Sequence, residues 1–312
     1  MLINEVVCFC DEHYTNLDGM CGQPDRKCTH PSGNCSHNCY KCLYHIHFPE
    51  RAPENSKTLY DCPKMLYHYV CQYSYLYTTE LLCAFEFEWD FLRDYSYYHI
   101  LSLGCGGCAD LMAFDYLCYE KQIECGISYL GIDVNKLWEP IHDKIKGYCQ
   151  EKNIRFNIGY YDVFECFKKR GVEDIKRGVE DINIIILSYL ISYLYNTDQI
   201  TKIDSLINDI VKKIIDKKKA GHHLLLVIND VNSNKRGRDH FSKFKKAISS
   251  SSLNILKSQY RYFDTGSLND FQKVGQPYDV KSCAFDIPTE IEEKYHARSS
   301  LNSTIQLILE VE

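Results

Sequence analysis

The sequence contains no apolar run that approaches the roughly 20 residues needed to span a bilayer. Its first residues, MLINEVVCFCDEH, lack a basic segment followed by a long apolar stretch, so we expect no secretory signal. Basic residues are not in excess either: 36 Lys and Arg stand against 42 Asp and Glu, for a net charge of -6. These absences favour a cytoplasmic protein without broad, non-specific adhesion to nucleic acid.

Cysteine, in contrast, is abundant, with 17 residues. In a reducing compartment we expect these side chains to be thiols or metal ligands and not disulfides. Later cysteines such as Cys118, Cys149 and Cys166 are scattered singly and are typical of small buried hydrophobic residues. The cysteines of the first segment are interleaved with histidines: they are Cys8, Cys10, Cys21, Cys28, Cys35, Cys39 and Cys42.

The chain divides into three zones. Residues 1–54 are rich in Cys and His and have little apolar periodicity, so we expect a small module that folds around metal. Residues 55–98 place aromatic side chains at three- and four-residue spacing, which predicts a helical connector. Residues 99–312 alternate short apolar runs with helical segments, which predicts an α/β domain.

The third zone predicts a Rossmann-like, mostly parallel sheet with an antiparallel hairpin at its end. An amphipathic helix is expected from Ile203 to Ile214, ended by Gly221. The heptapeptide KRGVEDI occurs twice in succession, at 169–175 and 176–182, and is interpreted as a surface duplication without chemistry. The expected parallel strands are 99–103, 128–132, 155–160, 183–187 and 224–229, and the expected hairpin strands are 259–263 and 304–310, with no clear helix between them.

The central motif is HILSLGCGGCADLM, at residues 99–112. An apolar strand runs into Gly104 and Gly106, Ala109 occupies the third position of a G-x-G-x-x-A pattern, and a helix follows. Glycines permit a tight turn and let a ligand approach without meeting a Cβ atom. The start of the helix supplies free N–H groups and the positive end of a dipole.

Acidic residues follow the next two strands. Asp133 ends the second strand, where a carboxylate can accept hydrogen bonds from both hydroxyls of an adenosine ribose. Asp162 ends the third strand, where it can accept from an adenine amino group while Val163 offers its backbone. Three successive strand ends therefore carry the atoms that an adenosine ligand requires.

On these motifs the sequence resembles the class I S-adenosylmethionine-dependent methyltransferases, from about residue 99 to the carboxyl terminus. The resemblance rests on ILSLGCGGCADL, YLGIDVN, YYDVF, NIIILSYLISYLY and the closing hairpin. It implies S-adenosylmethionine as cofactor, with Gly104 and Gly106 along the methionine part, Asp133 at the ribose, Asp162 at the adenine and residues 187–189 on the substrate side. The residues expected around the cofactor are Gly104, Cys105, Gly106, Asp110, Asp133, Val134, Asp162, Val163, Leu187 and Ser188.

The sequence also departs from the family pattern. Many members have an acid two positions before the first glycine, where this chain has Ser102, and Asp110 is the candidate replacement. The Asn/Asp-Pro-Pro-aromatic motif of exocyclic-amine methyltransferases and the Pro-Cys pair of cytosine C5 methyltransferases are both absent, which disfavours those DNA-base chemistries. A dinucleotide-binding domain for NAD, in which Asp133 would hold a ribose equally well, and a fold that no longer catalyses are the alternatives.

Methyl transfer needs alignment of nucleophile, methyl and sulfur, and needs a base only when the nucleophile carries a proton. Asp230 at the fifth strand end, Tyr73 on the aromatic helix and Ser188 after the fourth strand are the candidate catalytic residues. Tyr77 and Glu80 lie on the same helix as Tyr73 and are further candidates. Each can equally be a capping or core residue.

The cysteines of the first segment predict zinc. Cys28, Cys35, Cys39 and Cys42 form one candidate set, and the last pair has the two-residue gap that lets both sulfurs reach one tetrahedral ion. Cys8, Cys10, His13 and Cys21 form a second. A three-cysteine iron–sulfur loop, as in radical S-adenosylmethionine enzymes, and unliganded thiols are the alternatives.

The preferred function is a zinc-dependent methyltransferase that acts on a macromolecule, with RNA ahead of protein or DNA. Arg236 and Arg238 follow the fifth strand and are the candidate phosphate contacts. The alternatives are a small-molecule methyl- or aminocarboxypropyl-transferase and a non-catalytic, zinc-bearing scaffold.

Overall fold

The computed structural model describes residues 1–17, 38–52, 59–167, 180–218, 221–233, 235–264, 268–280, 282–298 and 303–312. Within these ranges, none of the helices combines the length and the apolar character that crossing a membrane requires. The longer helices are α1 (Leu2–Asn16), α2 (Cys39–His47), α3 (Pro63–Phe87), α5 (Ala109–Lys121), α6 (Glu139–Glu151), α9 (Ile203–Lys213) and α10 (Phe241–Ser249). The shorter ones are α4 (Trp89–Leu92), α8 (Leu190–Asn196) and α11 (Thr289–Tyr295), with 3-10 turns at Pro49–Arg51, Lys136–Trp138, Ile200–Lys202, Ile215–Lys217, Arg238–His240 and Asp270–Gln272.

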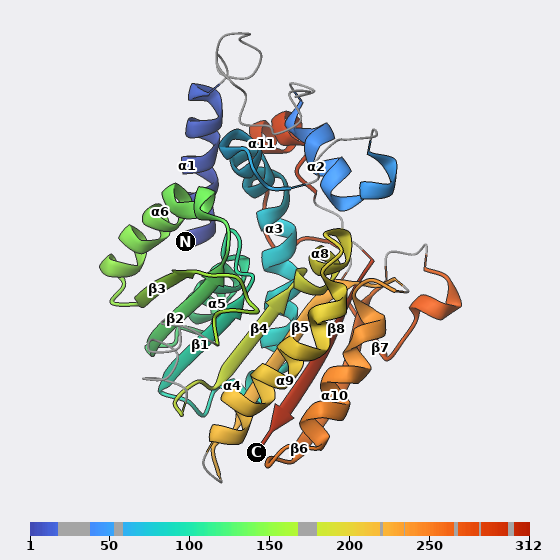
Figure 1. The fold of residues 1–312 in the computed structure, drawn as a ribbon. Coiled ribbons are helices and arrows are strands. Elements are labelled where there is room, and N and C mark those ends of the chain that lie inside the picture. Colours follow the sequence, from blue (N-terminus) through green and yellow to red (C-terminus); the bar gives the residue numbers. More distant parts are fainter. Residues whose placement is uncertain are drawn as a thin grey trace.

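In the part of the chain that the structure describes, eight strands form one sheet in the order β3-β2-β1-β4-β5-β8-β6-β7. The first five pair in parallel, β8 is antiparallel to both of its neighbours, and β7 pairs in parallel with β6 (Figure 1). The strands are β1 (Tyr97–Leu103), β2 (Gly126–Asp133), β3 (Arg155–Tyr160), β4 (Ile184–Ser188), β5 (Leu224–Val231), β6 (Ile255–Phe263), β7 (Gln276–Tyr278) and β8 (Thr304–Val311). This is the expected Rossmann-like, mostly parallel fold.

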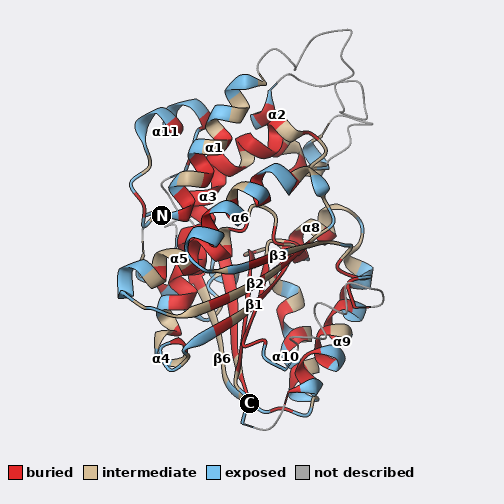
Figure 2. Cartoon of the chain, turned by 90° about the vertical axis from the view of Figure 1, so that its left-hand side faces the viewer, coloured by how far each residue is buried: buried red, intermediate tan, exposed pale blue. Residues whose placement is uncertain are grey.

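Alternating side chains of the central strands enter two separate cores. Ile184 and Ile186 of β4 pack with α1, α3, α5, α6 and α11, whereas Ile185 and Leu187 pack with α8, α9 and α10. A strand that is buried on both faces needs apolar residues at every position, which explains the continuous run IIIL. Figure 2 shows the buried strands between the two helical layers.

The segments with apolar periodicity form the expected helices and strands, but several of these elements begin or end at other residues than expected. Helix α9 buries Ile203, Leu206, Ile207, Ile210 and Val211 on one face. It ends at Lys213 and not at Gly221, because a 3-10 turn follows; Gly221, with φ +83°, lies in the turn before β5. The aromatic connector is mostly α3, and β1 begins at Tyr97, inside the zone that the sequence assigned to the connector.

The tail of the chain is more elaborate than a hairpin. β6 and β8 pair antiparallel as expected, but β7 and helix α11 lie between them in the chain. The expectation of no helix in this segment is therefore wrong. β8 also lies between β5 and β6 instead of at the edge, and β7 is the edge strand.

The first residues form a core helix. Leu2, Ile3, Val6, Val7 and Cys10 of α1 are buried, and they pack in the same core as α3, α5 and α6. The expectation that this part of the 1–54 zone lacks an apolar core is wrong, because residues 2–10 place apolar side chains along one helix face. Residues 18–37, most of the cysteine-rich segment, and residues 168–179, most of the KRGVEDI repeat, lie outside the described residues.

Candidate functional site

The turn after β1 is held by hydrogen bonds to the neighbouring strand β2. The N–H groups of Gly104 and Cys105 both donate to the carbonyl oxygen of Ile132, at 2.8 and 3.1 Å. Gly104 has φ +73° and Gly106 has φ +46°, a left-handed conformation that glycine adopts without strain. A Cβ atom at Gly104 would also lie 3.0 Å from Leu190. Both glycines are thus required by the backbone.

Asp133 connects this turn to the end of β2. Its Oδ2 accepts a hydrogen bond from the N–H of Gly106 at 2.9 Å, and its Oδ1 accepts from the N–H of Asn135 at 2.8 Å. Burial raises the pKa of Asp133, although these two hydrogen bonds act in the opposite direction. Because each carboxylate oxygen has a second lone pair, Asp133 can still accept hydrogen bonds from a ligand.

A cavity of about 380 Å³, here called the strand-end cavity, lies over the carboxyl ends of the parallel strands. Its wall contains the predicted residues Gly104, Gly106, Asp133, Val134, Asp162 and Val163, and also Ser188. Asp162 is fixed because its Oδ1 accepts from the N–H of Phe164 at 2.9 Å. The glycine turn and the two aspartates therefore face one shared hollow.

Three of the predicted cofactor residues do not line this cavity. Cys105 is buried, and Leu187 is buried in the core against α8. Asp110 is buried with its Oδ1 accepting from the N–H of Leu111 at 2.9 Å and from the Tyr129 hydroxyl at 3.0 Å. Burial raises the pKa of Asp110 to about 7. Asp110 is thus held inside the protein by its neighbours.

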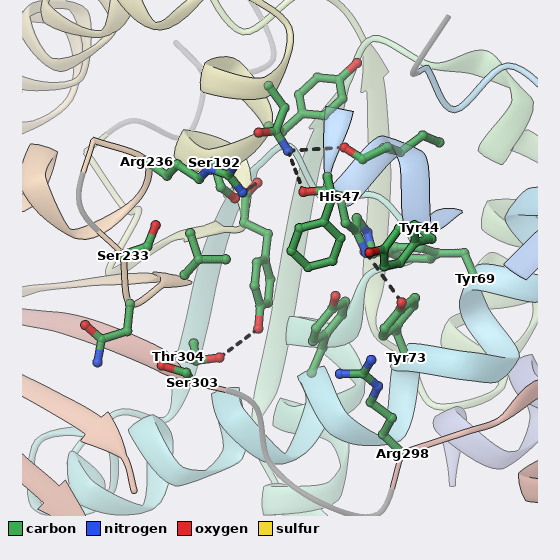
Figure 3. A pocket seen from close by; sticks show the side chains of 18 of the residues that line it. Tyr44, His47, Tyr69, Tyr73, Ser192, Ser233, Arg236, Arg298, Ser303 and Thr304 are labelled. Atoms are coloured by element: carbon green, nitrogen blue, oxygen red, sulfur yellow. Dashed lines mark hydrogen bonds between the residues drawn. The ribbon is translucent and has the colours of Figure 1, made fainter. Parts of the chain in front are cut away.

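A second cavity, of about 480 Å³ and here called the tyrosine cavity, adjoins the first. Tyr60, Tyr69, Tyr189 and Tyr193 line both cavities and form their common wall. Figure 3 shows that side chains from α2, α3 and the segment before β8 surround the tyrosine cavity. Its other lining residues include Tyr44, His47, Tyr73, Arg236, Arg298 and Thr304.

His47 lines the tyrosine cavity and contacts two of its tyrosines. Its Nε2 lies 3.1 Å from the Tyr60 hydroxyl. Its Nδ1 lies 3.4 Å from the Tyr73 hydroxyl (Figure 3). Burial, together with the charge of Arg298, lowers the pKa of His47 to about 4. The imidazole is therefore neutral at neutral pH and can accept a hydrogen bond, but it is a weak base. His47 was not among the residues predicted for this site.

Buried Glu80 fixes the common wall. Its carboxylate accepts from the hydroxyls of Tyr189, at 2.9 and 3.1 Å, and Thr304, at 2.8 Å, and from the amide of Asn229 at 3.0 Å. Burial raises the pKa of Glu80 to about 7, although these three hydrogen bonds act in the opposite direction. Glu80 lines neither cavity, so its contact with Tyr189 makes it a residue that positions the wall.

The three predicted catalytic residues lie in different places. Tyr73 lines the tyrosine cavity and Ser188 lines the strand-end cavity. Asp230 is completely buried and lines neither cavity; its Oδ2 accepts from the N–H groups of Ile191 at 2.9 Å and Ser192 at 3.1 Å. Asp230 therefore caps the start of α8, and burial raises its pKa to about 6.

The predicted zinc ligands are partly outside the described residues, namely Cys21, Cys28 and Cys35. Cys8 is exposed while Cys10 is buried, so the two thiols of α1 are on different sides of the helix. His13 uses its Nδ1 in a 2.8 Å contact with the carbonyl oxygen of Phe9. Cys39 and Cys42 lie on α2.

Within the described ranges, the group of three metal-binding side chains that the structure brings together consists of Cys105, Cys108 and His142. The sequence analysis did not predict this group. The two-residue spacing of Cys105 and Cys108 was a usable signal, but these residues were interpreted only as part of the glycine turn.

The two predicted phosphate contacts are already engaged. Arg236 lines the tyrosine cavity, and its Nη2 lies 3.0 Å from the Oε2 of Glu50. The guanidinium of Arg238 donates to the side chain of Asn232 at 3.0 Å and to the carbonyl oxygen of Phe271. Of the two, Arg236 is the one that borders a cavity.

The fold is similar to several solved structures. TrmN from Thermus thermophilus aligns over 80% of this chain and 48% of its own, about half its length, at 7% identity with a TM-score of 0.39. The plantazolicin methyltransferase BpumL, in complex with SAH, aligns over 97% of this chain and 99% of its own, at 11% identity with a TM-score of 0.38. An S-adenosylmethionine-dependent methyltransferase from Clostridium acetobutylicum aligns over 88% and 99%, at 10% identity with a TM-score of 0.37.

No protein-family model matches the sequence, and no curated protein matches it. These three similarities have identities of 11% or less and TM-scores below 0.5, so they do not identify a family.

Proposed function

We propose that this chain is an S-adenosylmethionine-dependent methyltransferase that binds its cofactor in the strand-end cavity. The observation that carries the proposal is that Gly104, Gly106, Asp133 and Asp162, from three successive strand ends, line one cavity. Open α/β sheets bind ligands at the carboxyl ends of their strands. The sequence resemblance to class I methyltransferases supplies the identity of the ligand.

The residues of the cavity fit the parts of this cofactor. Gly104 and Gly106 present backbone where a side chain would narrow the space for the methionine part. Asp133 offers two acceptor oxygens to the ribose hydroxyls, and Asp162 offers one to the adenine amino group. When bound, the cofactor supplies an electrophilic methyl group, so the protein has to align the acceptor and exclude water.

The tyrosine cavity is the proposed acceptor site, because it shares a wall of four tyrosines with the strand-end cavity. Aromatic walls favour a flat ring that stacks or packs edge-on against them. Neutral His47, 3.1 Å from the Tyr60 hydroxyl, can accept a hydrogen bond from that hydroxyl and hold it at the wall shared with the strand-end cavity. Tyr73, which also contacts His47, is the proposed orienting residue.

RNA remains the preferred acceptor, entering as a single base that leaves its stack. Arg236 at the cavity would contact a neighbouring phosphate only by leaving its ion pair with Glu50. That ion pair favours a second candidate, a small heteroaromatic compound that needs no phosphate contact. The zinc module, with Cys39 and Cys42 and the ligands outside the described residues, remains a proposal beside both.

Calorimetry with S-adenosylmethionine tests the central proposal. We expect the wild-type protein to bind the cofactor. Asp133→Asn should raise the Kd at least tenfold. The amide nitrogen cannot accept a hydrogen bond, so the N–H of Gly106 or of Asn135 loses its acceptor and the wall of the cavity changes. Asp143→Asn, an exposed residue on α6, is the matched control and should leave the Kd within about twofold. Absence of binding to wild-type protein would favour the scaffold alternative.

Transfer of label from the cofactor identifies the acceptor. Purified protein is incubated with methyl-labelled cofactor and separate fractions of cellular RNA, protein and small molecules. Label in RNA supports the preferred acceptor, label only in small molecules supports the second candidate, and label that appears only when the aminocarboxypropyl group is labelled refutes methyl transfer.

A further inference from the structure

Two thiols and an imidazole meet beneath the glycine turn. Cys105 and Cys108 flank Gly106 and Gly107 in the sequence, and His142 lies on α6. One potential ligand atom from each of Cys105, Cys108 and His142 lies within 4.8 Å of the other two. Their exposed fractions are 8%, 0% and 3%, so water does not separate these side chains from one another.

The donor set matches that of a borderline-soft divalent cation. Two cysteines separated by two residues are a recurrent half of tetrahedral zinc sites, and histidine is a common third ligand. His142 also has the outer contacts that orient a ligand histidine: its Nδ1 lies 2.9 Å from the Tyr160 hydroxyl and its Nε2 lies 2.7 Å from the carbonyl oxygen of Gly106. Whichever nitrogen binds the cation, the other keeps a hydrogen-bond partner.

The electrostatics of the group favour a bound cation. Two thiolates and a neutral imidazole around a divalent cation form a complex with no net charge, which removes the cost of burying an isolated charge.

We propose that Cys105, Cys108 and His142 form a binding site for a divalent cation of the zinc type, which attaches the glycine turn to α6. Binding releases two protons, one from each thiol, and changes no oxidation state. The fourth coordination position is left to a water molecule. The site is separate from the cysteine-rich segment and does not depend on the proposed methyl transfer.

The location couples the site to the wall of the strand-end cavity. Gly106 donates its N–H to Asp133 on one side, and its carbonyl oxygen contacts His142 on the other. A cation bound at Nδ1 would leave the contact between Nε2 and the Gly106 carbonyl in place, and would therefore restrict the peptide groups of the turn on both sides of Gly106. We expect the cation to raise the thermal stability of the protein.

Cobalt and zinc titrations of chelator-stripped full-length protein test the proposal. All variants carry Cys39→Ser and Cys42→Ser, so that the described thiols of the cysteine-rich segment do not contribute. We expect this parent protein to develop a thiolate-to-cobalt charge-transfer absorption that zinc abolishes, and to bind one equivalent more cation than Cys105→Ala/Cys108→Ala in the same background. Cys71→Ala/Cys166→Ala, which removes two other buried thiols, is the matched control and should bind like the parent.

The result that would overturn the site is an equal cation content and an identical cobalt spectrum for the parent and Cys105→Ala/Cys108→Ala. If the double variant does not fold, His142→Asn replaces it, because asparagine keeps hydrogen-bonding capacity but is not a thiolate-site ligand of comparable strength. If His142→Asn had the cobalt absorption of the parent and were stabilised by zinc to the same extent, the proposal would again be refuted. Loss of both, with a native circular dichroism spectrum, supports it.

Discussion

At the scale of single residues, Gly106 is held through both its N–H and its carbonyl group. It combines φ +46° with an N–H bonded to Asp133 and a carbonyl oxygen in contact with His142. A Cβ atom there would lie 3.7 Å from Trp138, which is ordinary van der Waals contact. The constraint at Gly106 is thus one of backbone conformation and ligand approach, and not of packing.

We therefore expect Gly106→Ala to lower the free energy of unfolding by only about 1 kcal/mol, the cost of a left-handed alanine. The same substitution should raise the Kd for S-adenosylmethionine at least tenfold, because the added methyl group lies on the wall of the strand-end cavity. Gly147→Ala on α6, where a Cβ atom meets nothing within 4 Å, is the control. It should stabilise the protein slightly and leave the Kd unchanged.

Glu80 gives a prediction about pH. Its pKa rises from an ordinary value of 4.5 to about 7 in the folded state, so the folded protein holds a proton that the unfolded chain has released. The associated stability is complete below pH 4.5 and is lost as pH rises to about 7, and it amounts to about 3 kcal/mol.

The measurement is the free energy of unfolding of wild type and Glu80→Gln between pH 4.5 and 8, by denaturant titration. We expect the advantage of wild type over Glu80→Gln to decrease across this interval. A difference that is constant with pH would show that Glu80 has the same pKa in both states. Comparing the two proteins cancels the contributions of carboxylates that do not interact with Glu80.

At the scale of elements, α3 contributes side chains both to the tyrosine cavity and to the main core. Tyr69, Tyr73 and Tyr77 recur every four residues and line the tyrosine cavity, while Leu66, Val70 and Leu81 pack in the main core. The shorter helix α2 supplies His47 from the opposite side. The tyrosine cavity therefore depends on how two helices pack over the carboxyl end of the sheet (Figures 1 and 3).

The two cavities should respond separately to substitution. Tyr73 lines only the tyrosine cavity and Asp162 only the strand-end cavity. We expect Tyr73→Ala to raise the KM for the acceptor at least tenfold while the Kd for S-adenosylmethionine stays within about twofold. Asp162→Asn should have the reverse effect, measured in the same transfer assay and by calorimetry. Equal effects of both substitutions on both ligands would refute the division of roles.

The elements that the sequence predicted well are those with strong periodicity. The boundaries of β3 are those expected, and the core of each parallel strand was identified, because the apolar runs are bounded by polar or turn residues. β7 has only three residues and α11 only seven, so neither is long enough to show a period. Helix α1 was missed although Leu2, Val6 and Cys10 recur every four residues, because Cys8 and Cys10 were interpreted first as metal ligands.

The candidate site was predictable where one segment carries the pattern and not where distant segments meet. Gly104, Asp133 and Asp162 each follow a strand, and parallel strand ends meet at one edge of the sheet. Whether Asp230 faces the cavity or caps α8 depends on the path of the chain after β4. His47 and His142 each reach their partners from another element, which no local spacing indicates.

At the scale of the whole molecule, α1 connects the first residues of the chain to helices α5 and α6. The N–H of Leu2 donates to Asp115 of α5 at 3.0 Å, and Glu5 pairs with Lys144 of α6 at 2.8 Å. Ile3 is 1% exposed. The first residues of the chain are thus part of the domain that contains the sheet.

We expect Ile3→Ala to lower the free energy of unfolding by about 2–5 kcal/mol, the usual effect of truncating a buried isoleucine. Cys8→Ala, at an exposed position of the same helix, should change it by less than about 0.5 kcal/mol. Denaturant titration of both variants measures the difference. If the two variants were equally stable, α1 would not be part of the cooperative unit.

The position of β8 has a consequence for how the chain is made. β8 is the last strand along the sequence but lies between β5 and β6, and it pairs antiparallel with both (Figure 1). During translation β5 and β6 leave the ribosome first, and each then has an unpaired edge that faces the place of the missing strand. Unpaired edges of this kind are templates for joining other chains. A ribosome that stalls before Thr304 would therefore hold a nascent protein with an open slot in the middle of its sheet, and such stalled chains should be the ones that chaperones retain.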